Sequence, residues 1–539
     1  MPLYLNNDTQ DLKHYYRDLF VDKSGALKVF NQILETREHF VCVSKPHCFG
    51  KTHMAALINA YYSKGSNTKA FFDDLEISKD KNYLKHLNKH NVLWLNIYSE
   101  IFANSGRLEL KDIVHFITHR ILKELEEKYH ISFTSQTLSD ALKTLYYQKG
   151  ERFIIIIDDF DVPYRKFGNQ EKDLKEYMLF LDSLINTKDA SLFTELVYLT
   201  GVLPMKKVSA KPLPNLREYT QLHSYELTPY YGFTLDELKD ICHRNNLPYE
   251  DCLKLYDGYE IDGVRVVNPY SIVRLDTHDN LSFYWLRTAC PGLVTELAER
   301  FSKLCDILIQ ILNHEYYKSI KLSSFCNDPN TITNYQQALT YMIHLGYLSI
   351  NFKTHQIYIP SLEARAALEN AIFACSKGRF SKIIPLSKEL LRNTKMVNPD
   401  PSYLAKIMGA FHEEYTSEQD YSKPSSLEKV LTYAYFACNY SSGYDKPIFS
   451  LDPINGVATL FLHSKYTHEY DQSSDPSMII ELKSCYTKDS LMNRIKRGEE
   501  PYPAILQDYT GYFLFVEYLF DEDTKVHTCV IDGRLMKLL

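Results

Sequence analysis

The chain has 539 residues, with 61 Lys and Arg against 68 Asp and Glu, and it carries a formal net charge of −7. This balance excludes a protein that binds nucleic acid through positive charge spread over its whole surface, but it is compatible with a local basic groove. Because hydrophobic residues make up 45% of the chain, wholesale disorder is excluded, and the length predicts about two to four globular domains.

Cysteine usage and the first residues of the chain predict a cytoplasmic protein without membrane contact. The 11 cysteines form no CxxC pair, which is typical of reduced, buried thiols. Cys242, His243 and Cys252 come nearest to a metal-binding cluster, but no second pair follows them at zinc spacing. The N-terminal residues lack a basic segment followed by an apolar run, and no stretch approaches the roughly 20 apolar residues that a membrane span needs.

The first third of the chain alternates short apolar strands with helical segments. Strands are expected at 39–44, 91–97, 152–158 and 195–201, and helices at 54–62 and 112–129. Strands this short and apolar, separated by helices, predict a parallel sheet with helices on both faces. We therefore predict an α/β domain over residues 1–230.

The remainder divides into a mainly helical region, 231–395, and an α+β region, 396–539. In the first, Thr234 and Glu237 form the capping-box pattern that begins a helix, and alternating residues in 346–360 predict a hairpin. In the second, a helix is expected at 425–438 and strands at 456–463, 477–484, 511–519 and 527–532.

A phosphate-binding loop is the first motif that carries chemistry. Residues 45–52 lie between an expected strand and an expected helix, and such a loop binds phosphate through its backbone N–H groups and the helix N-terminus. Gly50, Lys51 and Thr52 supply the GKT of the motif, with Lys51 at the outer phosphates and Thr52 on Mg²⁺. The loop departs from the motif at Lys45, which occupies the position of the first Gly. We also expect Lys45 to contact the nucleotide.

A second motif predicts ATP and Mg²⁺ as ligands. The strand at 152–158 ends in Asp158 and Asp159. In P-loop enzymes the first such acid holds Mg²⁺ through water and the next polarises the attacking water, so we expect Asp158 to be a metal ligand and Asp159 to be catalytic. Thr200 ends the next strand, where it either senses the γ-phosphate or is an ordinary residue before Gly201.

An ordered set of segments resembles a known family. These segments are FVDKSGAL (20–27), KPHCFGKTHMAALINAYYSKG (45–65), IIIIDDFDVPY (154–164), YLTGVLP (198–204), YYGFTLDEL (230–238), YDGYEIDGVRVVNPYSIV (256–273), LGYLSI (345–350) and IPSLEARAAL (359–368). Together they resemble AAA-ATPase-like proteins that carry a C-terminal PD-(D/E)XK nuclease-type domain. The resemblance implies a P-loop NTPase domain, a helical lid or winged-helix-like middle domain, and a restriction-endonuclease-like C-terminal domain. The family usually reads RPRRFGKS in the loop and IDEYD at the second motif, where this chain has KPHCFGKT and IDDFD.

The strand at 477–484 carries a candidate second site. Glu481 and Lys483 are two residues apart and share one face of the strand, where they could form a salt bridge. The resemblance implies instead that Glu481 binds Mg²⁺, that Lys483 orients the attacking water, and that Glu428 on the preceding helix assists. The family's second metal-binding Asp falls on Thr459, whose neutral hydroxyl is a poor ligand for a hard divalent cation. A nuclease-like fold with weak or absent cleavage is therefore expected.

Three functions stay open at this point. The leading hypothesis is an ATP-binding protein with a degenerate nuclease module, in which ATP controls the binding of nucleic acid or of a protein partner. The second is an active Mg²⁺-dependent nuclease in which Asp452 replaces the missing acid. The third is an interaction protein in which both sites are relics, as the changes at Pro46, His47 and Cys48 suggest. Four basic residues have two open interpretations, because they either line a groove for nucleic acid or form a solvated helix face. They are Lys488, Arg494, Lys496 and Arg497.

Overall fold

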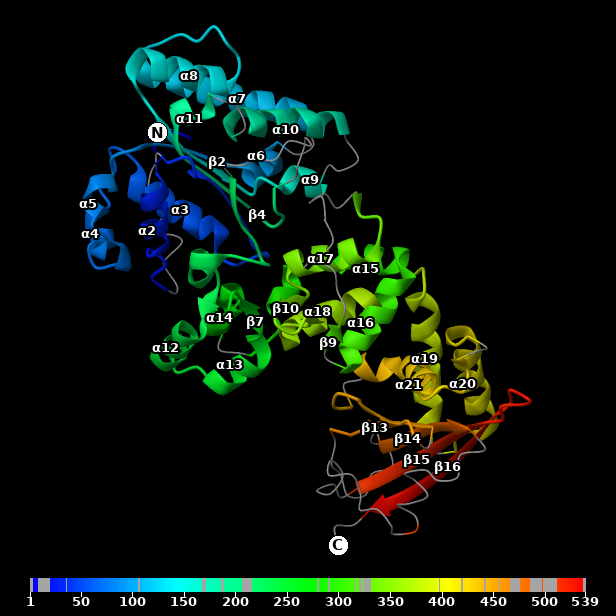
Figure 1. Ribbon diagram of the computed structural model, residues 1–539. Coiled ribbons are helices and arrows are strands. Elements are labelled where there is room, and N and C mark those ends of the chain that lie inside the picture. The colour runs from blue at the N-terminus through cyan, green and yellow to red at the C-terminus, as the bar shows by residue number, and fades with distance from the viewer. Residues whose placement is uncertain are drawn as a thin grey trace. The chain divides into compact units, whose positions relative to one another are not determined.

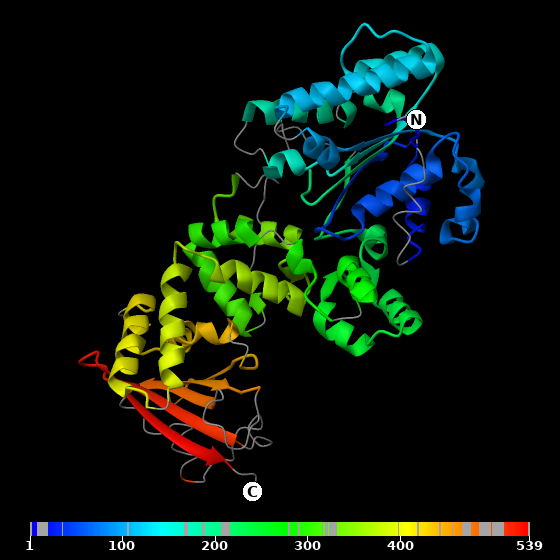
Figure 2. The ribbon, with the colours of Figure 1, turned by 180° about the vertical axis from the view of Figure 1, so that it is seen from behind.

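The chain folds into two units, which are coloured along the sequence in Figure 1 and seen from behind in Figure 2. One unit comprises residues 1–289 and 319–367, and the other comprises residues 290–318 and 368–539. The expected middle region, 231–395, therefore contributes to both units. The computed structural model describes residues 3–7, 20–34, 36–104, 107–166, 171–185, 189–205, 216–278, 281–288, 291–314, 316–318, 322, 331–396, 398–417, 420–440, 443–454, 456–465, 476–484, 497 and 511–536.

A five-stranded sheet forms the centre of the first unit. Its strands lie in the order β2-β3-β4-β1-β5, and every neighbouring pair is parallel. The strands are β1 (Phe40–Ser44), β2 (Asn91–Asn96), β3 (Phe153–Asp158), β4 (Thr194–Gly201) and β5 (Leu216–Tyr219). The predicted parallel sheet is thus confirmed, and its four apolar strands agree with the sequence to within a few residues. The fifth strand was missed because its sequence, LREY, is mostly polar, as an edge strand allows.

Helices cover both faces of this sheet, as Figures 1 and 2 show. One apolar cluster joins the sheet to α6, α7, α8, α10 and α11, and another joins it to α2, α3, α4 and α5. The helices are α2 (Ala26–Ile33), α3 (Lys51–Tyr62), α4 (Lys69–Phe72), α5 (Tyr83–His86), α6 (Ile97–Ala103), α7 (Leu110–Tyr129), α8 (Leu138–Lys149), α9 (Val162–Lys166), α10 (Glu171–Ile185) and α11 (Ala190–Phe193).

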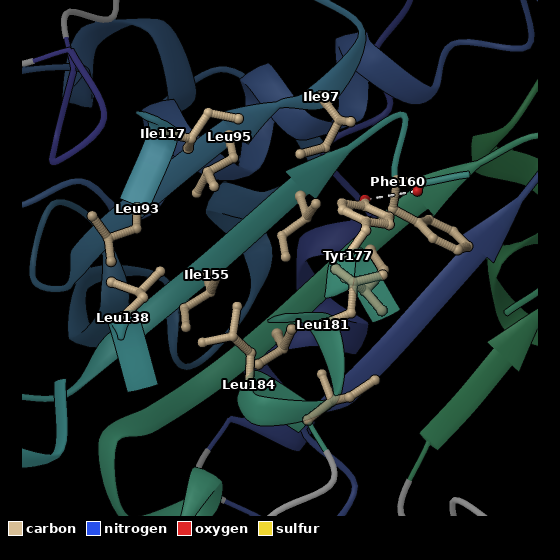
Figure 3. Close-up of a cluster of buried hydrophobic side chains, with 14 of the residues drawn as sticks. Leu93, Leu95, Ile97, Ile117, Leu138, Ile155, Phe160, Tyr177, Leu181 and Leu184 are labelled. Carbon is tan, nitrogen blue, oxygen red and sulfur yellow. Dashed lines mark hydrogen bonds between the residues drawn. The ribbon is translucent and has the colours of Figure 1, made fainter. Parts of the chain in front are cut away.

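Strand alternation explains why both faces are apolar. In β3, Ile155 faces the α7–α10 cluster and Ile154 faces the α2–α3 cluster, and both side chains are fully buried. Each such side chain stabilises the fold by about 1.5–3 kcal/mol. Figure 3 shows the first cluster, in which the Tyr177 hydroxyl on α10 donates a 2.8 Å hydrogen bond to the Phe160 carbonyl just after β3. This bond fixes the chain where the acidic motif ends.

The rest of the first unit is helical with two small sheets. Helix α12 begins at the capping box formed by Thr234 and Glu237, as the sequence predicts, and the predicted hairpin is present as the antiparallel pair β10 and β11. A three-stranded sheet in the order β6-β8-β7 was not expected. The remaining elements are β6 (Phe233–Thr234), α12 (Leu235–Asn245), α13 (Tyr249–Tyr256), β7 (Tyr259–Ile261), β8 (Val264–Val267), α14 (Pro269–His278), α17 (Tyr335–Leu345), β10 (Ser349–Asn351), β11 (Gln356–Tyr358) and the beginning of α18 (Leu362–Phe373), whose last six residues belong to the second unit.

The second unit contains a mixed sheet in the order β12-β13-β14-β15-β16. Only β14 and β15 are parallel; the other neighbouring pairs are antiparallel. Helix α21 packs against β13 and β14, and α20 packs against β16. The elements are α15 (Pro291–Arg300), α16 (Ser302–His314), β9 (Tyr316–Lys318), α19 (Phe380–Thr394), α20 (Pro401–Tyr415), α21 (Pro424–Ala434), β12 (Ile448–Asp452), β13 (Val457–Leu462), β14 (Ser477–Ser484), β15 (Gly511–Phe520) and β16 (His527–Met536).

These elements confirm the expected α+β pattern and add β12, which the sequence did not indicate. Among the described residues of both units, no helix has the length and apolar character that crossing a membrane requires.

Candidate functional site

The loop between β1 and α3 has the geometry of a phosphate-binding loop. Gly50 precedes the helix with a φ of 84°, a left-handed conformation that favours glycine, and Cys48 has a φ of 67°. Phe49 between them is fully buried and packs edge-on against Tyr259, with 5.2 Å between ring centroids. Gly346 also lies against the loop, because a Cβ there would come within 2.9 Å of the Pro46 side chain. Tertiary packing thus holds the loop in shape.

Lys51 lies inside this loop. Its side-chain ammonium donates to the Lys45 carbonyl at 3.0 Å and to the Pro46 carbonyl at 2.8 Å, and the residue is only 6% exposed. Burial lowers the pKa of Lys51, whereas the nearby carboxylates of Asp159 and Asp161 act in the opposite direction. The ammonium is therefore held at the loop by weak acceptors, which an anion could replace.

Lys45, the second lysine of the loop, is fully buried. Its ammonium donates to the Thr220 carbonyl at 3.1 Å rather than entering the space inside the loop. Burial lowers the pKa of Lys45 to about 7; Asp262 partly offsets this effect and Lys51 adds to it. The structure thus places Lys45 behind the loop, where it supports the backbone.

Two carboxylates follow β3 at the same edge of the sheet. Asp158 is fully buried, and its Oδ2 accepts a 2.9 Å hydrogen bond from the Asn96 amide at the end of β2. Burial raises the pKa of Asp158 to about 7, the Asp159 charge adds to the rise, and the Thr52 hydroxyl opposes it. Asp159 has a φ of 56°, and burial raises its pKa as well. The side chains that the two motifs predicted therefore meet at one point.

Among the buried oxygens at this edge that lack a hydrogen bond of normal geometry within the described part of the chain, two lie on the neighbouring strands β3 and β4. They are Asp158 Oδ1 and Thr200 Oγ1, and the two residues are directly paired between β3 and β4. Buried polar atoms without such bonds are costly, and they commonly mark a place where a ligand or ion binds. The Asp158 carboxylate and the Thr52 hydroxyl, which interact with each other, are hard oxygen donors of the kind that Mg²⁺ prefers.

A cavity of about 490 Å³ opens beside the loop. One wall is polar and includes Lys51, Thr52 and Asp159. A second part of the lining, here called the apolar wall, comes from segments far apart in the sequence. Its side chains include Val21, Tyr230, Phe233, Pro269, Tyr270 and Val273. A cavity of this size, lined by both charged and apolar side chains, can accommodate a nucleotide, since small-molecule sites span about 300–1,000 Å³.

The apolar wall is braced by an ion pair that the sequence did not reveal. The Lys23 ammonium lies 2.6 Å from Glu237 Oε2 and donates to the Pro229 carbonyl at 2.7 Å. Lys23 and Phe233 also make a cation–π contact at 5.8 Å. Only the resemblance of 20–27 and 230–238 to one family hinted that these segments act together, because neither has a chemical motif of its own.

The second candidate site lies on one face of the mixed sheet. Thr459 is paired with Glu481 across β13 and β14, and Glu481 is paired with Glu517 across β14 and β15. Paired residues face the same side of a sheet, so a hydroxyl and two carboxylates stand in a row. Glu481 is fully buried and Thr459 is 5% exposed.

Lys483 is engaged within this face. Its ammonium lies 2.9 Å from Glu517 Oε2, and their side chains are only 4% and 14% exposed. Asp452 pairs with Val457 on β13, so two strand spacings of about 4.8 Å each separate its backbone from β14. On α21, Glu428 Oε1 lies 3.9 Å from His314 Nε2. Glu517, which the sequence analysis missed, is thus the acid beside the Glu481–Lys483 pair.

The expected basic residues Lys488, Arg494 and Lys496 lie outside the described residues. Arg497 is described and is exposed in a turn. Within the described ranges, no group of three or more His, Cys, Asp or Glu side chains is arranged to hold a metal ion. Cys242 and Cys252 are both buried free thiols.

The sheet order and the loop geometry give the N-terminal part of the first unit a P-loop NTPase-like fold. Residues 12–210 match a family model described as "Predicted AAA-ATPase". An uncharacterized protein from the vnfD 5′ region of Azotobacter chroococcum mcd 1 is 23% identical over 373 residues, which span 66% of this chain and 66% of that protein, just under two thirds of its length.

Two solved structures resemble parts of the chain weakly. The Aeropyrum pernix ORC2 protein in ADPNP–ADP complexes matches with 13% identity over 66% of this chain and 95% of that one, at a TM-score of 0.32. A DNA replication initiation factor matches with 12% identity over 78% of this chain and 96% of that one, at a TM-score of 0.25.

Proposed function

We propose that the first unit binds ATP together with Mg²⁺ in the cavity beside residues 45–52. The observation that carries the proposal is that Lys51 and Thr52, which line a cavity of about 490 Å³, both interact with the Asp158 carboxylate behind them. Lys51 would exchange its two carbonyl contacts for phosphate oxygens, and the N-terminus of α3 would add its positive dipole end. The apolar wall would enclose the base.

The donor set has the chemistry that Mg²⁺ prefers. The Thr52 hydroxyl and the Asp158 carboxylate are hard oxygen donors, and Asp158 Oδ1 lacks a hydrogen bond of normal geometry in the described residues. When bound, Mg²⁺ neutralises phosphate charge. Asp159, which lines the cavity, is the residue in position to orient water. Nucleotide binding is thus the core of the proposal, and hydrolysis is a separate property to be measured.

Titration with a fluorescent ATP analogue tests the binding proposal. The wild type should bind saturably with Mg²⁺, and Lys51→Ala should bind at least about tenfold more weakly, since a charge-assisted hydrogen bond contributes about 1.5–3 kcal/mol. Lys85→Ala, at an exposed lysine of the same unit, is the matched control and should bind like the wild type. Equal and negligible binding by the wild type and Lys51→Ala would favour the alternative of an interaction protein whose sites are relics.

For the second unit we propose a degenerate PD-(D/E)XK nuclease-like module that binds nucleic acid or a protein partner without cutting. Two observations support this proposal. A helix precedes three antiparallel strands and a fourth strand parallel to the third, and the ExK lysine is neutralised by Glu517 at 2.9 Å. A lysine held in this ion pair is not free to orient water.

Nuclease assays decide between this proposal and an active enzyme. The wild type should leave single- and double-stranded DNA and RNA intact with Mg²⁺ or Mn²⁺. Cleavage that is lost in both Glu481→Gln and Lys483→Ala would establish an active nuclease instead. Cleavage that survives both substitutions would indicate contamination.

A further inference from the structure

Arg165 is not one of the residues that line the cavity, but its side chain contacts one that is. It belongs to α9 (Val162–Lys166), which follows the acidic motif, and its side chain is 14% exposed. Its Nε donates to Asp161 Oδ2 at 2.8 Å. Neither the phosphate-binding loop nor the acidic motif requires an arginine at this position, so the structure alone brings it to the site.

Asp161 is an anchor whose position does not depend on Arg165. Its Oδ2 also accepts hydrogen bonds from the backbone N–H groups of Val202 at 3.1 Å and Leu203 at 2.9 Å. Asp161 is fully buried and lies so close to Gly201 that a Cβ there would come within 2.5 Å of its Oδ1. The carboxylate is therefore fixed by backbone groups, and it orients the guanidinium rather than being held by it.

The far end of the guanidinium points to the phosphate-binding loop. Arg165 Nη1 donates to His47 Nε2 at 3.2 Å, and His47 lines the cavity. Burial lowers the pKa of His47 to about 3, with Lys51 and Arg165 adding to the effect. The imidazole is therefore neutral at physiological pH, and its Nε2 can accept the hydrogen bond.

Arg165 contacts Asp161 and His47, and the contact with His47 is the one that a ligand can replace. A neutral imidazole is a weaker partner for a guanidinium than a phosphate group, which carries negative charge and can accept two parallel hydrogen bonds. The charge of Arg165 already acts on both Lys51 and Asp159, and both of these residues line the cavity. Arg165 therefore lies within electrostatic reach of any anion bound between them.

We propose that Arg165 is a phosphate-binding residue supplied by the same chain, which exchanges its His47 contact for the terminal phosphate of a nucleoside triphosphate. The inference rests on the proposed nucleotide site and adds a specificity to it. Lys51 contacts the phosphates of both a diphosphate and a triphosphate, whereas Arg165 contacts the terminal phosphate alone. Because its anchor Asp161 also binds the backbone of Val202 and Leu203, the contact links the triphosphate to the segment after β4.

The dissociation constants of fluorescent ATP and ADP analogues with Mg²⁺ test this inference in the full-length chain. Arg165→Ala should weaken ATP binding about tenfold or more and ADP binding by less than about threefold, as expected for the loss of one charge-assisted contact to a single phosphate. Arg165→Gln, which keeps hydrogen-bonding groups without charge, is the fallback if the alanine variant folds poorly and should show the same selective loss. Arg244→Ala, at an exposed arginine of the same unit, should change neither constant.

The outcomes separate this inference from the proposed function. If the wild type binds ATP but the Arg165 variants keep its ATP-to-ADP preference, the inference is overturned and the nucleotide site stands. An equal loss of both affinities, accompanied by a lower melting temperature, would show that Arg165 only braces Asp161, and this too would overturn the inference. A wild type that binds neither nucleotide would overturn both.

Discussion

Replacing Lys45 with Met should change how the stability of the protein depends on pH. Lys45 is fully buried, and burial lowers its pKa to about 7 from the ordinary value of 10.5. Between these two values the unfolded chain binds more protons at this side chain than the folded chain does. The penalty that Lys45 imposes on folding is therefore largest below pH 7 and shrinks as the pH rises toward 10.5.

The magnitude follows from the shift. Each pH unit well above 7 reduces the penalty by about 1.4 kcal/mol, so the wild type should gain about 2 kcal/mol relative to Lys45→Met between pH 7 and pH 9. Below pH 7 the difference between the two proteins should be nearly constant. The variant should thus have its greatest advantage in stability at pH 6.

Urea unfolding of both proteins at pH 6, 7 and 9 provides the measurement. Lys89→Met, at an exposed lysine, is the control and should show no such trend. A stability difference between the wild type and Lys45→Met that is the same at pH 6 and pH 9 would refute the reasoning, because it would mean that Lys45 keeps an ordinary pKa in the folded protein.

Three further substitutions probe other parts of the account. Glu517→Ala should destabilise the second unit by about 3–5 kcal/mol in urea unfolding, because it leaves Lys483 buried without its partner carboxylate. The double variant Lys483→Met with Glu517→Leu should lose much less stability, and an equal loss in the two variants would contradict this reasoning. Gly201→Ala should cost about 1–3 kcal/mol in thermal unfolding, since its Cβ would meet Asp161 Oδ1 at 2.5 Å, whereas Gly292→Ala, with no atom within 4 Å, should not destabilise. Asp158→Asn should abolish the dependence of ATP affinity on Mg²⁺; a variant that still gains affinity from Mg²⁺ would remove Asp158 from the ligand set.

The parallel sheet could be predicted because its strands are buried on both faces. Such strands read as continuous apolar runs, and RFIIIID at 152–158 is the clearest of them. The edge strands β5 and β12 carry no such signal, since all the side chains of IFSLD and all those of LREY except Tyr219 are only partly buried or exposed. An edge strand is identified by the strand with which it pairs, and the local sequence alone does not specify that pairing.

The proposed nucleotide site divides in a similar way into a part that the local sequence predicts and a part that it does not. Lys51, Thr52 and Asp158 come from motifs whose spacing reports their chemistry. The apolar wall comes from Val21, Tyr230 and other side chains in segments that meet only in the folded unit. Local spacing therefore predicts the polar lining of the cavity but not its apolar wall.

Arg165 and Glu517 show what register and packing add. Arg165 is separated from His47 by 118 positions along the chain, and Glu517 reaches Lys483 through the pairing of β14 with β15. Neither partner can be inferred from residue spacing. The sequence does correctly indicate Thr459 beside Glu481, because the resemblance aligned both strands.

Calorimetric titration of ATP into the full-length wild type with Mg²⁺ tests the central claim most directly. One site per chain, with an affinity that falls at least about tenfold in Lys51→Ala and is unchanged in Lys85→Ala, is the result that the account predicts. Absence of heat from binding in the wild type, or an affinity that Lys51→Ala leaves unchanged, would contradict it.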